Sequence, residues 1–254
     1  ASLGYNTDFT GDDIIKYSGS NDDWLGFDSG LRDLPRSVVG ATNGGRSLTI
    51  CDPAIDPVRC TSELDAASLG VKFQDDYNIS SKEALPNVEA SWAFGDRLEA
   101  GGNEWGYYLA ATYDRTTSDR GVAKLTNPLE TVGTYSRSRE STALSGYFVA
   151  GYEFGAADEI LAKTTALRSS DDTTRQESGI EQREDNTINS AILEWVEREF
   201  LSQSFSGHHE FDTANVTHQL DWRVAYSQTS RYEPDRRQYT YFNNTLSTSS
   251  FERR

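Results

Sequence analysis

The chain has 254 residues, of which 40 are acidic and 24 basic, so it carries a formal net charge of −16 at pH 7. This charge repels phosphate, and we therefore expect no nucleic-acid binding and no docking to membranes through basic residues. The sequence has no apolar run of the roughly 18 residues that a membrane-spanning helix requires, and its start does not read as a signal peptide. Because the chain opens with Ala1 and contains no Met, we expect a processed or incomplete part of a longer protein.

Residues 1–87 are acidic, rich in Gly, Ser, Asn and Asp, and show little sustained alternation, which is typical of loops. Cys51 and Cys60 lie here with two prolines between them. A local disulfide is geometrically plausible and would indicate an oxidising compartment. Free thiols are the second interpretation, and a metal pair the third, because two cysteines without a nearby His make half a zinc site.

From residue 88 onward, apolar and polar residues alternate, as expected for strands with one apolar face. The first alternating pair flanks the turn at residues 100–103, and the second flanks residues 155–158. A third pair, the clearest, joins residues 188–211 to residues 216–226 through residues 212–215. The pattern therefore predicts three hairpins in an all-β, antiparallel up-and-down meander.

The connections between these hairpins are predicted to be long polar loops, over residues 114–139, 168–187 and 227–254. Short turns at one end of a sheet and long loops at the other are typical of outer-membrane barrels. An apolar face of Trp, Tyr and Phe opposite a polar face fits lipid outside and a polar lumen inside. A secreted β-sandwich shares the alternation, but unstructured loops of roughly twenty residues are unusual there.

Several stretches carry a more specific pattern than alternation. They are Asp23-Trp-Leu-Gly-Phe-Asp-Ser-Gly30 with Leu31-Arg-Asp-Leu-Pro35, Tyr77-Asn-Ile-Ser80 with Ala84-Leu-Pro-Asn87, Ser91-Trp-Ala-Phe-Gly-Asp-Arg97, Ile192-Leu-Glu-Trp-Val-Glu-Arg-Glu-Phe200, and Asp221-Trp-Arg-Val-Ala-Tyr-Ser227 running to Glu233-Pro-Asp-Arg-Arg237. In this order they resemble the early barrel of TonB-dependent receptors from Gram-negative outer membranes. Each stretch alone is a weak signal, whereas the ordered set touches most of the chain.

The resemblance implies a transmembrane β-barrel of about 22 strands, closed by an N-terminal plug that this sequence does not contain. Residues 1–7 would be the end of the first strand, residues 8–87 a long extracellular loop, and residues 88–254 strands two to seven with their extracellular loops. It further implies a location in the bacterial outer membrane, among lipid and lipopolysaccharide. The implied partner is the TonB–ExbB–ExbD complex, acting through the absent plug.

The activity that the resemblance implies is non-enzymatic, TonB-dependent uptake of a scarce nutrient. An iron chelate, cobalamin, an oligosaccharide or a peptide are equally open, and no cofactor is expected. Two other functions remain: a passive porin-like or structural outer-membrane barrel, and a secreted β-sandwich that binds a ligand.

Few residues suggest site chemistry. A group of basic and aromatic side chains could contact an anionic, aromatic ligand, although salt bridges within loops explain them equally well. This group is Arg231, Tyr232, Arg236, Arg237 and Tyr239. We expect no catalytic residue and no metal site, because His208 and His209 point to opposite faces of a strand and the paired aspartates at 12–13, 22–23, 75–76 and 171–172 read as solvated. Glu194, Glu197, Arg198 and Glu199 are expected to form cross-strand pairs.

Overall fold

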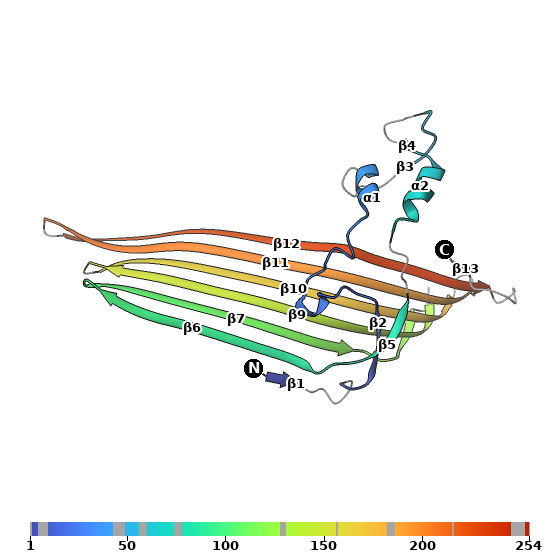
Figure 1. Cartoon of the computed structure of the whole chain (residues 1–254), viewed down its shortest axis with the longest axis horizontal. Coiled ribbons are helices and arrows are strands. Elements are labelled where there is room, and N and C mark those ends of the chain that lie inside the picture. Colours follow the sequence, from blue (N-terminus) through green and yellow to red (C-terminus); the bar gives the residue numbers. More distant parts are fainter. Residues whose placement is uncertain are drawn as a thin grey trace.

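The computed structural model describes residues 2–4, 10–42, 49–55, 60–73, 78–127, 131–155, 157–181, 186–214, 216–244 and 252–253. Over these residues, six long strands form one antiparallel meander (Figure 1). They are β6 (Asn87–Ala100), β7 (Asn103–Asp119), β9 (Thr131–Phe154), β10 (Asp158–Glu181), β11 (Asn186–Thr213) and β12 (Val216–Asn244). The predicted antiparallel, up-and-down meander is therefore confirmed, in a chain that is mostly β and also contains short helices. Within the described part of the chain, the sheet does not close on itself.

Three short strands extend this sheet. β1 (Ser2–Gly4) pairs with β6, β13 (Glu252–Arg253) pairs with β12, and β8 (Ala123–Asn127) pairs with β9. The pairing of Leu3 with Val88 joins the first residues to the start of β6, although residues 1 and 5–7 of the predicted first strand lie outside the described residues.

The three predicted hairpins are present, and they place their tight turns at one end of the sheet, which we call the turn end. Ala100 pairs with Asn103 across Gly101 and Gly102, whose positive φ values of 63° and 79° suit a two-residue hairpin turn. The next hairpins close with Phe154 opposite Asp158 and Thr213 opposite Val216. Ala156 and Asn215 of these turns lie outside the described residues.

The predicted long loops are wrong for most of their length. β7 continues to Asp119, β9 already begins at Thr131, β10 runs to Glu181 and β12 to Asn244. Only four residues, 182–185, separate β10 from β11. Alternation fades in these parts because both faces carry polar side chains there, whereas ladder pairing and abundant Thr, Ser and Tyr keep the backbone extended.

The two faces of the meander differ strongly towards the turn end. Side chains at every second position form an apolar face, which includes Trp92, Phe94, Leu98, Trp105, Leu109, Phe148, Tyr152, Ile160, Leu201, Phe205, Trp222 and Val224. Trp92 is 55% exposed, Phe205 51% and Val224 64%. No second sheet covers these side chains within the described residues.

The opposite, polar face carries hydroxyl groups and charges. Thr112 and Ser145 hydrogen-bond across β7 and β9, Arg97 pairs with Glu104, and Asp171 accepts a hydrogen bond from Ser141 at 2.7 Å. These are ordinary cross-strand contacts of a polar sheet face.

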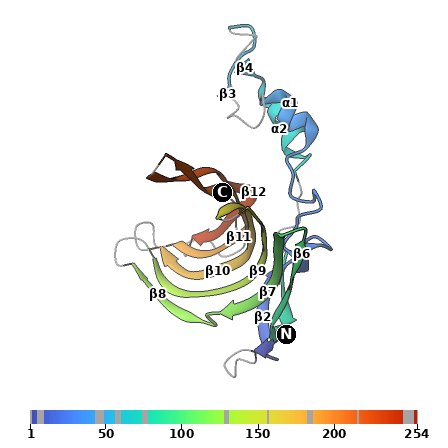
Figure 2. The ribbon, with the colours of Figure 1, turned by 90° about the vertical axis from the view of Figure 1, so that its left-hand side faces the viewer.

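Towards the other end, the far end, the apolar face is covered by the chain's own N-terminal segment, residues 10–35. Figure 2 shows this segment along one side of the curved sheet. It contains β2 (Asp13–Tyr17) and the 3₁₀ helix η1 (Asp23–Leu25), and β2 pairs with β5 (Ile79–Glu83). The largest fully buried side chains, Tyr17, Leu193 and Trp195, lie in this contact. Trp195 and Phe205 are an even number of residues apart on β11, so the N-terminal segment covers the same face that is bare at the turn end.

The described parts of residues 36–73, namely 36–42, 49–55 and 60–73, project away from the sheet (Figure 1). They hold α1 (Arg36–Ala41), the parallel pair β3 (Thr49–Ile50) and β4 (Cys60–Thr61), and α2 (Glu63–Gly70). Ser62 caps α2 by accepting a hydrogen bond from the Asp65 amide at 3.1 Å. Neither α-helix that the structure describes has the length or apolar composition to cross a bilayer.

Candidate functional site

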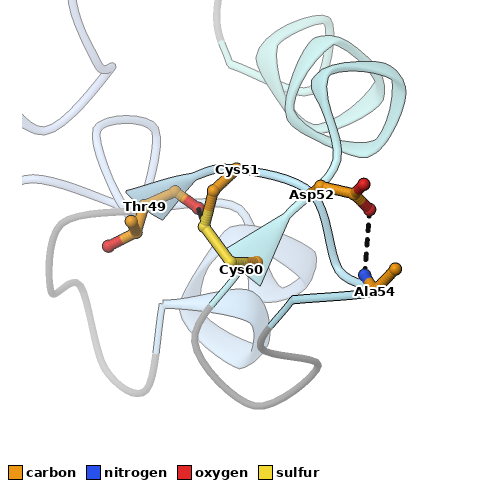
Figure 3. The surroundings of a disulfide bond; sticks show 5 residues. All are labelled: Thr49, Cys51, Asp52, Ala54 and Cys60. Atoms are coloured by element: carbon orange, nitrogen blue, oxygen red, sulfur yellow. Dashed lines mark hydrogen bonds between the residues drawn. A yellow bond between two sulfur atoms is a disulfide. The ribbon is translucent and has the colours of Figure 1, made fainter.

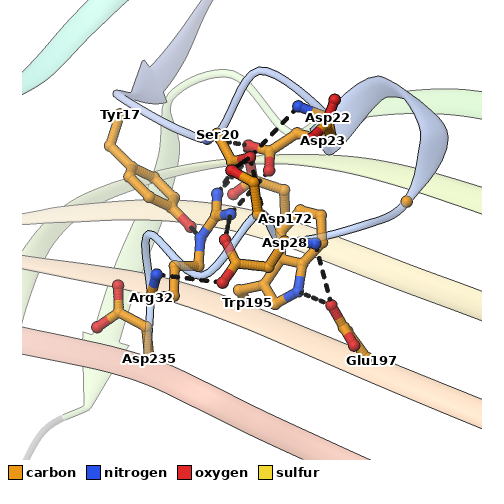
Figure 4. Close-up of polar contacts among 12 residues, drawn as sticks. Tyr17, Ser20, Asp22, Asp23, Asp28, Arg32, Asp172, Trp195, Glu197 and Asp235 are labelled. Atoms are coloured by element: carbon orange, nitrogen blue, oxygen red, sulfur yellow. Dashed lines mark hydrogen bonds and ion pairs between the residues drawn. The ribbon is translucent and has the colours of Figure 1, made fainter. Parts of the chain in front are cut away.

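The N-terminal segment is fastened to the sheet around one buried arginine, Arg32, whose side chain has no exposed surface (Figure 4). Its two terminal nitrogens donate to the two carboxylate oxygens of Asp23, both at 2.7 Å, in a bidentate pair. Nη1 also donates to Asp28 Oδ1 at 2.9 Å. Nε donates to the Tyr17 hydroxyl at 3.2 Å, and the guanidinium lies 4.2 Å from the ring centroid of Trp195. The planar fork of arginine suits this combination of bidentate pairing and stacking.

The local backbone brings these groups together. η1 ends at Gly26, which has a left-handed φ of 79°, and Gly30 adopts φ 85°, so the chain turns twice between Asp23 and Arg32. Asp28 Oδ2 accepts a hydrogen bond from the Arg32 backbone amide at 3.1 Å, and Asp23 accepts one from Ser20 at 3.0 Å. The two carboxylates are therefore fixed before they meet the guanidinium.

The sheet supplies a further carboxylate, Asp172 on β10. Its side chain is 6% exposed and lies 3.9 Å from Arg32 Nη2, but neither oxygen has a hydrogen-bond partner among the described residues. Burial raises the pKa of Asp172 to about 7, against the opposing charges of Arg32 and Lys16 and with the help of Asp23 and Glu140. This carboxyl group can therefore change its charge near neutral pH.

A second ion cluster lies beside the first. Glu140 on β9 pairs with Lys16 of β2 and, at 2.7 Å, with Arg115 of β7. Burial opposes ionisation of Glu140, but Lys16 and Arg115 hold its pKa below the ordinary value. Between the two clusters is a cavity of about 260 Å³ whose lining includes Lys16, Glu140 and Asp172.

The third attachment uses Arg168 of β10. Its Nε donates to the Gly26 carbonyl oxygen at 3.1 Å, and its guanidinium pairs with Glu197 at 2.7 Å and with Glu199. The same guanidinium lies 4.2 Å from the ring centroid of Phe27. Glu197 also accepts a hydrogen bond from the Trp195 indole at 2.9 Å, which links this attachment to the Arg32 cluster.

Together, these contacts hold the N-terminal segment on the sheet, and the carboxyl group of Asp172 is left without a hydrogen-bond partner among the described residues. Most of the charges there are compensated by neighbours, and no nucleophile stands beside a general base in the described cluster. No group of three or more His, Cys, Asp or Glu residues that could hold a metal ion occurs in the part of the chain that the structure describes.

The five predicted ligand-contact residues do not form one site. Arg231 pairs with Glu233 at 2.9 Å and Arg236 with Glu194 at 3.6 Å, both on the polar side of β12. On the other side, the Tyr232 hydroxyl donates to Asp33 at 3.2 Å, Arg237 pairs with Asp235 at 2.9 Å, and Tyr239 packs edge-on against Tyr241. Each of these side chains therefore has a contact within the chain.

Cys51 and Cys60 form a disulfide in the projecting residues 36–73, with their Cα atoms 4.9 Å apart (Figure 3). It joins the end of β3 to β4. A turn follows Cys51, in which the Ala54 amide donates to Asp52 at 2.9 Å. Residues 56–59 of the closed loop lie outside the described residues.

The predicted cross-strand pairs of the charged run on β11 are present: Arg198 pairs with Asp171 at 2.6 Å, and the glutamates pair with Arg168 and Arg236. The histidines lie on opposite faces as expected. His208 contacts Asp221 at 2.7 Å, and His209 contacts Asp158 at 3.0 Å.

Sequence reasoning missed the Arg32 cluster. The expectation that the paired aspartates are solvated is wrong for Asp23 and Asp172, whose side chains are 12% and 6% exposed. Arg32 lies beside both, and it is close to Asp23 in the sequence but distant from Asp172. Asp75 and Asp76 lie outside the described residues. The one signal available was the single Arg32 among four aspartates between residues 22 and 33.

No protein-family model matches the chain, and no curated protein matches it.

Proposed function

We propose that this chain is part of the wall of an outer-membrane β-barrel of a TonB-dependent receptor, and that it serves energy-coupled nutrient uptake rather than catalysis. The observation that carries the membrane part is the apolar face at the turn end, which stays exposed while the opposite face is polar. In an outer-membrane barrel, such faces meet lipid and lumen respectively.

Strand length supports the same assignment. A membrane-crossing strand needs about 9–11 residues, whereas β9 and β10 have 24 each, β11 has 28 and β12 has 29. The remaining length carries the polar far end and the N-terminal segment, which we assign to the extracellular side. The Arg32 cluster then lies outside the bilayer, where its charges are tolerated.

The proposal requires further strands. An open sheet in hydrocarbon would leave edge backbone groups unsatisfied at several kcal/mol each. We propose that a plug and about fifteen more strands, encoded beyond these 254 residues, complete a barrel of the size that the resemblance implies. The choice of a receptor over a passive barrel rests on that resemblance alone. The nutrient is open, and the net charge of −16 weakly disfavours a strongly anionic one.

The test uses the full-length product of the gene. We expect it in the outer-membrane fraction, with a gel mobility that changes on boiling in detergent, and we expect a purified periplasmic domain of TonB to bind it. A protein that is monodisperse in water without detergent would contradict the membrane assignment and favour a secreted sandwich. Outer-membrane location without TonB binding would favour a passive or structural barrel.

A further inference from the structure

The apolar face is bounded at the turn end by a row of aromatic rings that crosses the meander. Trp105 stacks on Tyr152 with ring centroids 3.9 Å apart, and Tyr152 stacks on Phe154 at 5.1 Å. The row continues through His209, whose ring lies 6.1 Å from Phe154 and 6.4 Å from Trp222. We call these five residues the turn-end row. A row of amphipathic rings is typical of the position where a barrel wall passes from hydrocarbon to headgroups.

From this row towards the far end, the apolar face continues for a length that matches a bilayer. On β9 it runs from Phe154 to Leu144, and on β11 from Phe211 to Leu201, a separation of ten residue steps in each case. Ten residues span about 33 Å along a strand, or about 25 Å across the membrane at a tilt of about 40°. On β7, β9, β11 and β12 these face positions carry no Asp, Glu, Lys or Arg among the described residues. On β10 the charges lie at the two borders, Asp158 opposite Phe154 and Arg168 opposite Leu144, and Asp96 lies on the edge strand β6 near the turn end.

At the far-end border of this band, the N-terminal segment adds aromatic side chains to Tyr113 of β7. The Tyr113 hydroxyl, level with Leu144 on the sheet, donates to the Trp24 carbonyl oxygen at 2.7 Å. Phe27 lies on the guanidinium of Arg168, the residue paired with Leu144 on the next strand. Although the backbone around Trp24 and Phe27 is attached to the sheet, Trp24 stays 56% exposed and Phe27 stays 41% exposed.

We infer that residues 22–30 are an interfacial anchor: a non-strand segment that places Trp24 and Phe27 in the headgroup region of the outer leaflet. This inference rests on the proposed function, which supplies the membrane. We assign a lipid surface as the partner of this anchor for two reasons. The exposed part of the apolar face has the height of a hydrocarbon layer, and the turn-end row forms an aromatic border on one side of it. The anchor supplies the aromatic border on the other side. The segment thereby fixes the depth of the wall in the membrane, since aromatic rings at both borders resist vertical displacement.

Attachment by buried ion pairs suits this role. The Gly26 backbone is packed against Ser170 and Thr142, so that a Cβ at Gly26 would meet Ser170 Oγ at 2.9 Å. Arg168 donates a hydrogen bond to the Gly26 carbonyl oxygen, and Arg32 donates to the carboxylate of Asp23. Trp24 and Phe27 are thus presented from a rigid turn, which lowers the entropy lost when they enter the interface.

The experiment is fluorine NMR on the full-length protein in lipid nanodiscs, with 5-fluorotryptophan incorporated. The resonances are assigned by Trp→Phe substitution at positions 24, 105, 195 and 222. Lipids that carry a nitroxide at the headgroup broaden every fluorine close to the interface. Trp105 and Trp222 of the turn-end row are the internal positive controls, and buried Trp195 at the far end is the negative control.

We expect the Trp24 resonance to broaden as strongly as those of Trp105 and Trp222, while that of Trp195 stays sharp. A sharp Trp24 resonance beside broadened Trp105 and Trp222 resonances would overturn the anchor and leave the membrane assignment standing. If none of the four resonances broadens, the membrane assignment itself fails and the anchor fails with it. A nitroxide placed at the acyl-chain end should broaden Trp24 less than the headgroup nitroxide does; the reverse order would overturn the interfacial depth.

Discussion

Replacing Arg32 with Ala should release the N-terminal segment from the sheet. The substitution leaves Asp23, Asp28 and Asp172 buried with no guanidinium beside them, and their side chains are 12%, 6% and 6% exposed. Removing one partner of a buried, hydrogen-bonded ion cluster costs about 3–5 kcal/mol. Since about 1.4 kcal/mol is tenfold in an equilibrium constant, the population of the open segment should rise by about two to four orders of magnitude.

Backbone hydrogen exchange measures this opening. The Gly26 amide, bonded to the Asp23 carbonyl oxygen at 2.9 Å, and the Arg32 amide, bonded to Asp28, report on the segment. Their exchange should accelerate in Arg32→Ala, while the amide of Leu109 within β7 should keep its rate. Arg32→Lys should lie between Arg32→Ala and the unsubstituted protein, because an ammonium keeps the charge but cannot bind Asp23 through a planar fork.

The matched control is Arg231→Ala, which removes an arginine from an exposed ion pair with Glu233. Exposed pairs contribute about 0–1 kcal/mol, so exchange of the Gly26 amide should change by less than about fivefold. If Arg32→Ala has no larger effect than Arg231→Ala, the buried cluster does not hold the segment, and our account of the site is wrong.

Three further outcomes follow from the geometry. Between about pH 4 and pH 7, buried Asp172 keeps a proton that it would release when the segment opens. The free energy of opening should therefore fall as the pH rises, by up to about 1.4 kcal/mol per pH unit. Exchange of the Gly26 amide, corrected for its intrinsic pH dependence, should show this slope, and Asp172→Asn should abolish it. Reduction of the Cys51–Cys60 disulfide should add the mass of two hydrogen atoms, and an unchanged mass would contradict the bond. It should destabilise only the projecting residues, by about 2.5–3 kcal/mol of loop-closure entropy, which local hydrogen exchange would show. Gly207→Ala should displace Trp222, because a Cβ there would overlap its indole ring, and a Trp222 fluorescence spectrum identical to that of the unsubstituted protein would contradict this packing.

The sequence predicted the fold best where the two faces of a strand differ. Alternation between residues 105 and 113, or between 216 and 226, fixed both the hairpins and the side of each residue, because a register shift by one would exchange the apolar and polar faces. The signal disappeared where both faces are polar. Residues 114–119 and 168–181 continue their strands without alternation, and the prediction of long loops failed there.

Local sequence patterns could not predict the Arg32 cluster, for a different reason. Arg32 meets Asp172 and Trp195 only after the sheet has formed, and each of these residues looks ordinary within its own stretch. A charged residue reads as solvated unless its partner is known, and the partners here lie up to 163 residues apart, from Arg32 to Trp195. The glycines at 26 and 30 were a visible sign of a fixed turn, but not of what that turn holds.

The failure of the loop prediction changes which observation separates a barrel wall from a sandwich. Loop asymmetry no longer distinguishes them, since β10 and β11 are joined by four residues at the far end. The observation that still distinguishes them is that the apolar face is buried at the far end and exposed at the turn end of the same strands. At the far end Trp195 is 1% exposed beneath the N-terminal segment, whereas Phe205 on the same face of β11 is 51% exposed. A sandwich would have to cover both regions with protein, and the described residues cover only one. The bare region is about 25 Å tall and begins at an aromatic row, and this profile supports the proposed assignment to a hydrocarbon layer.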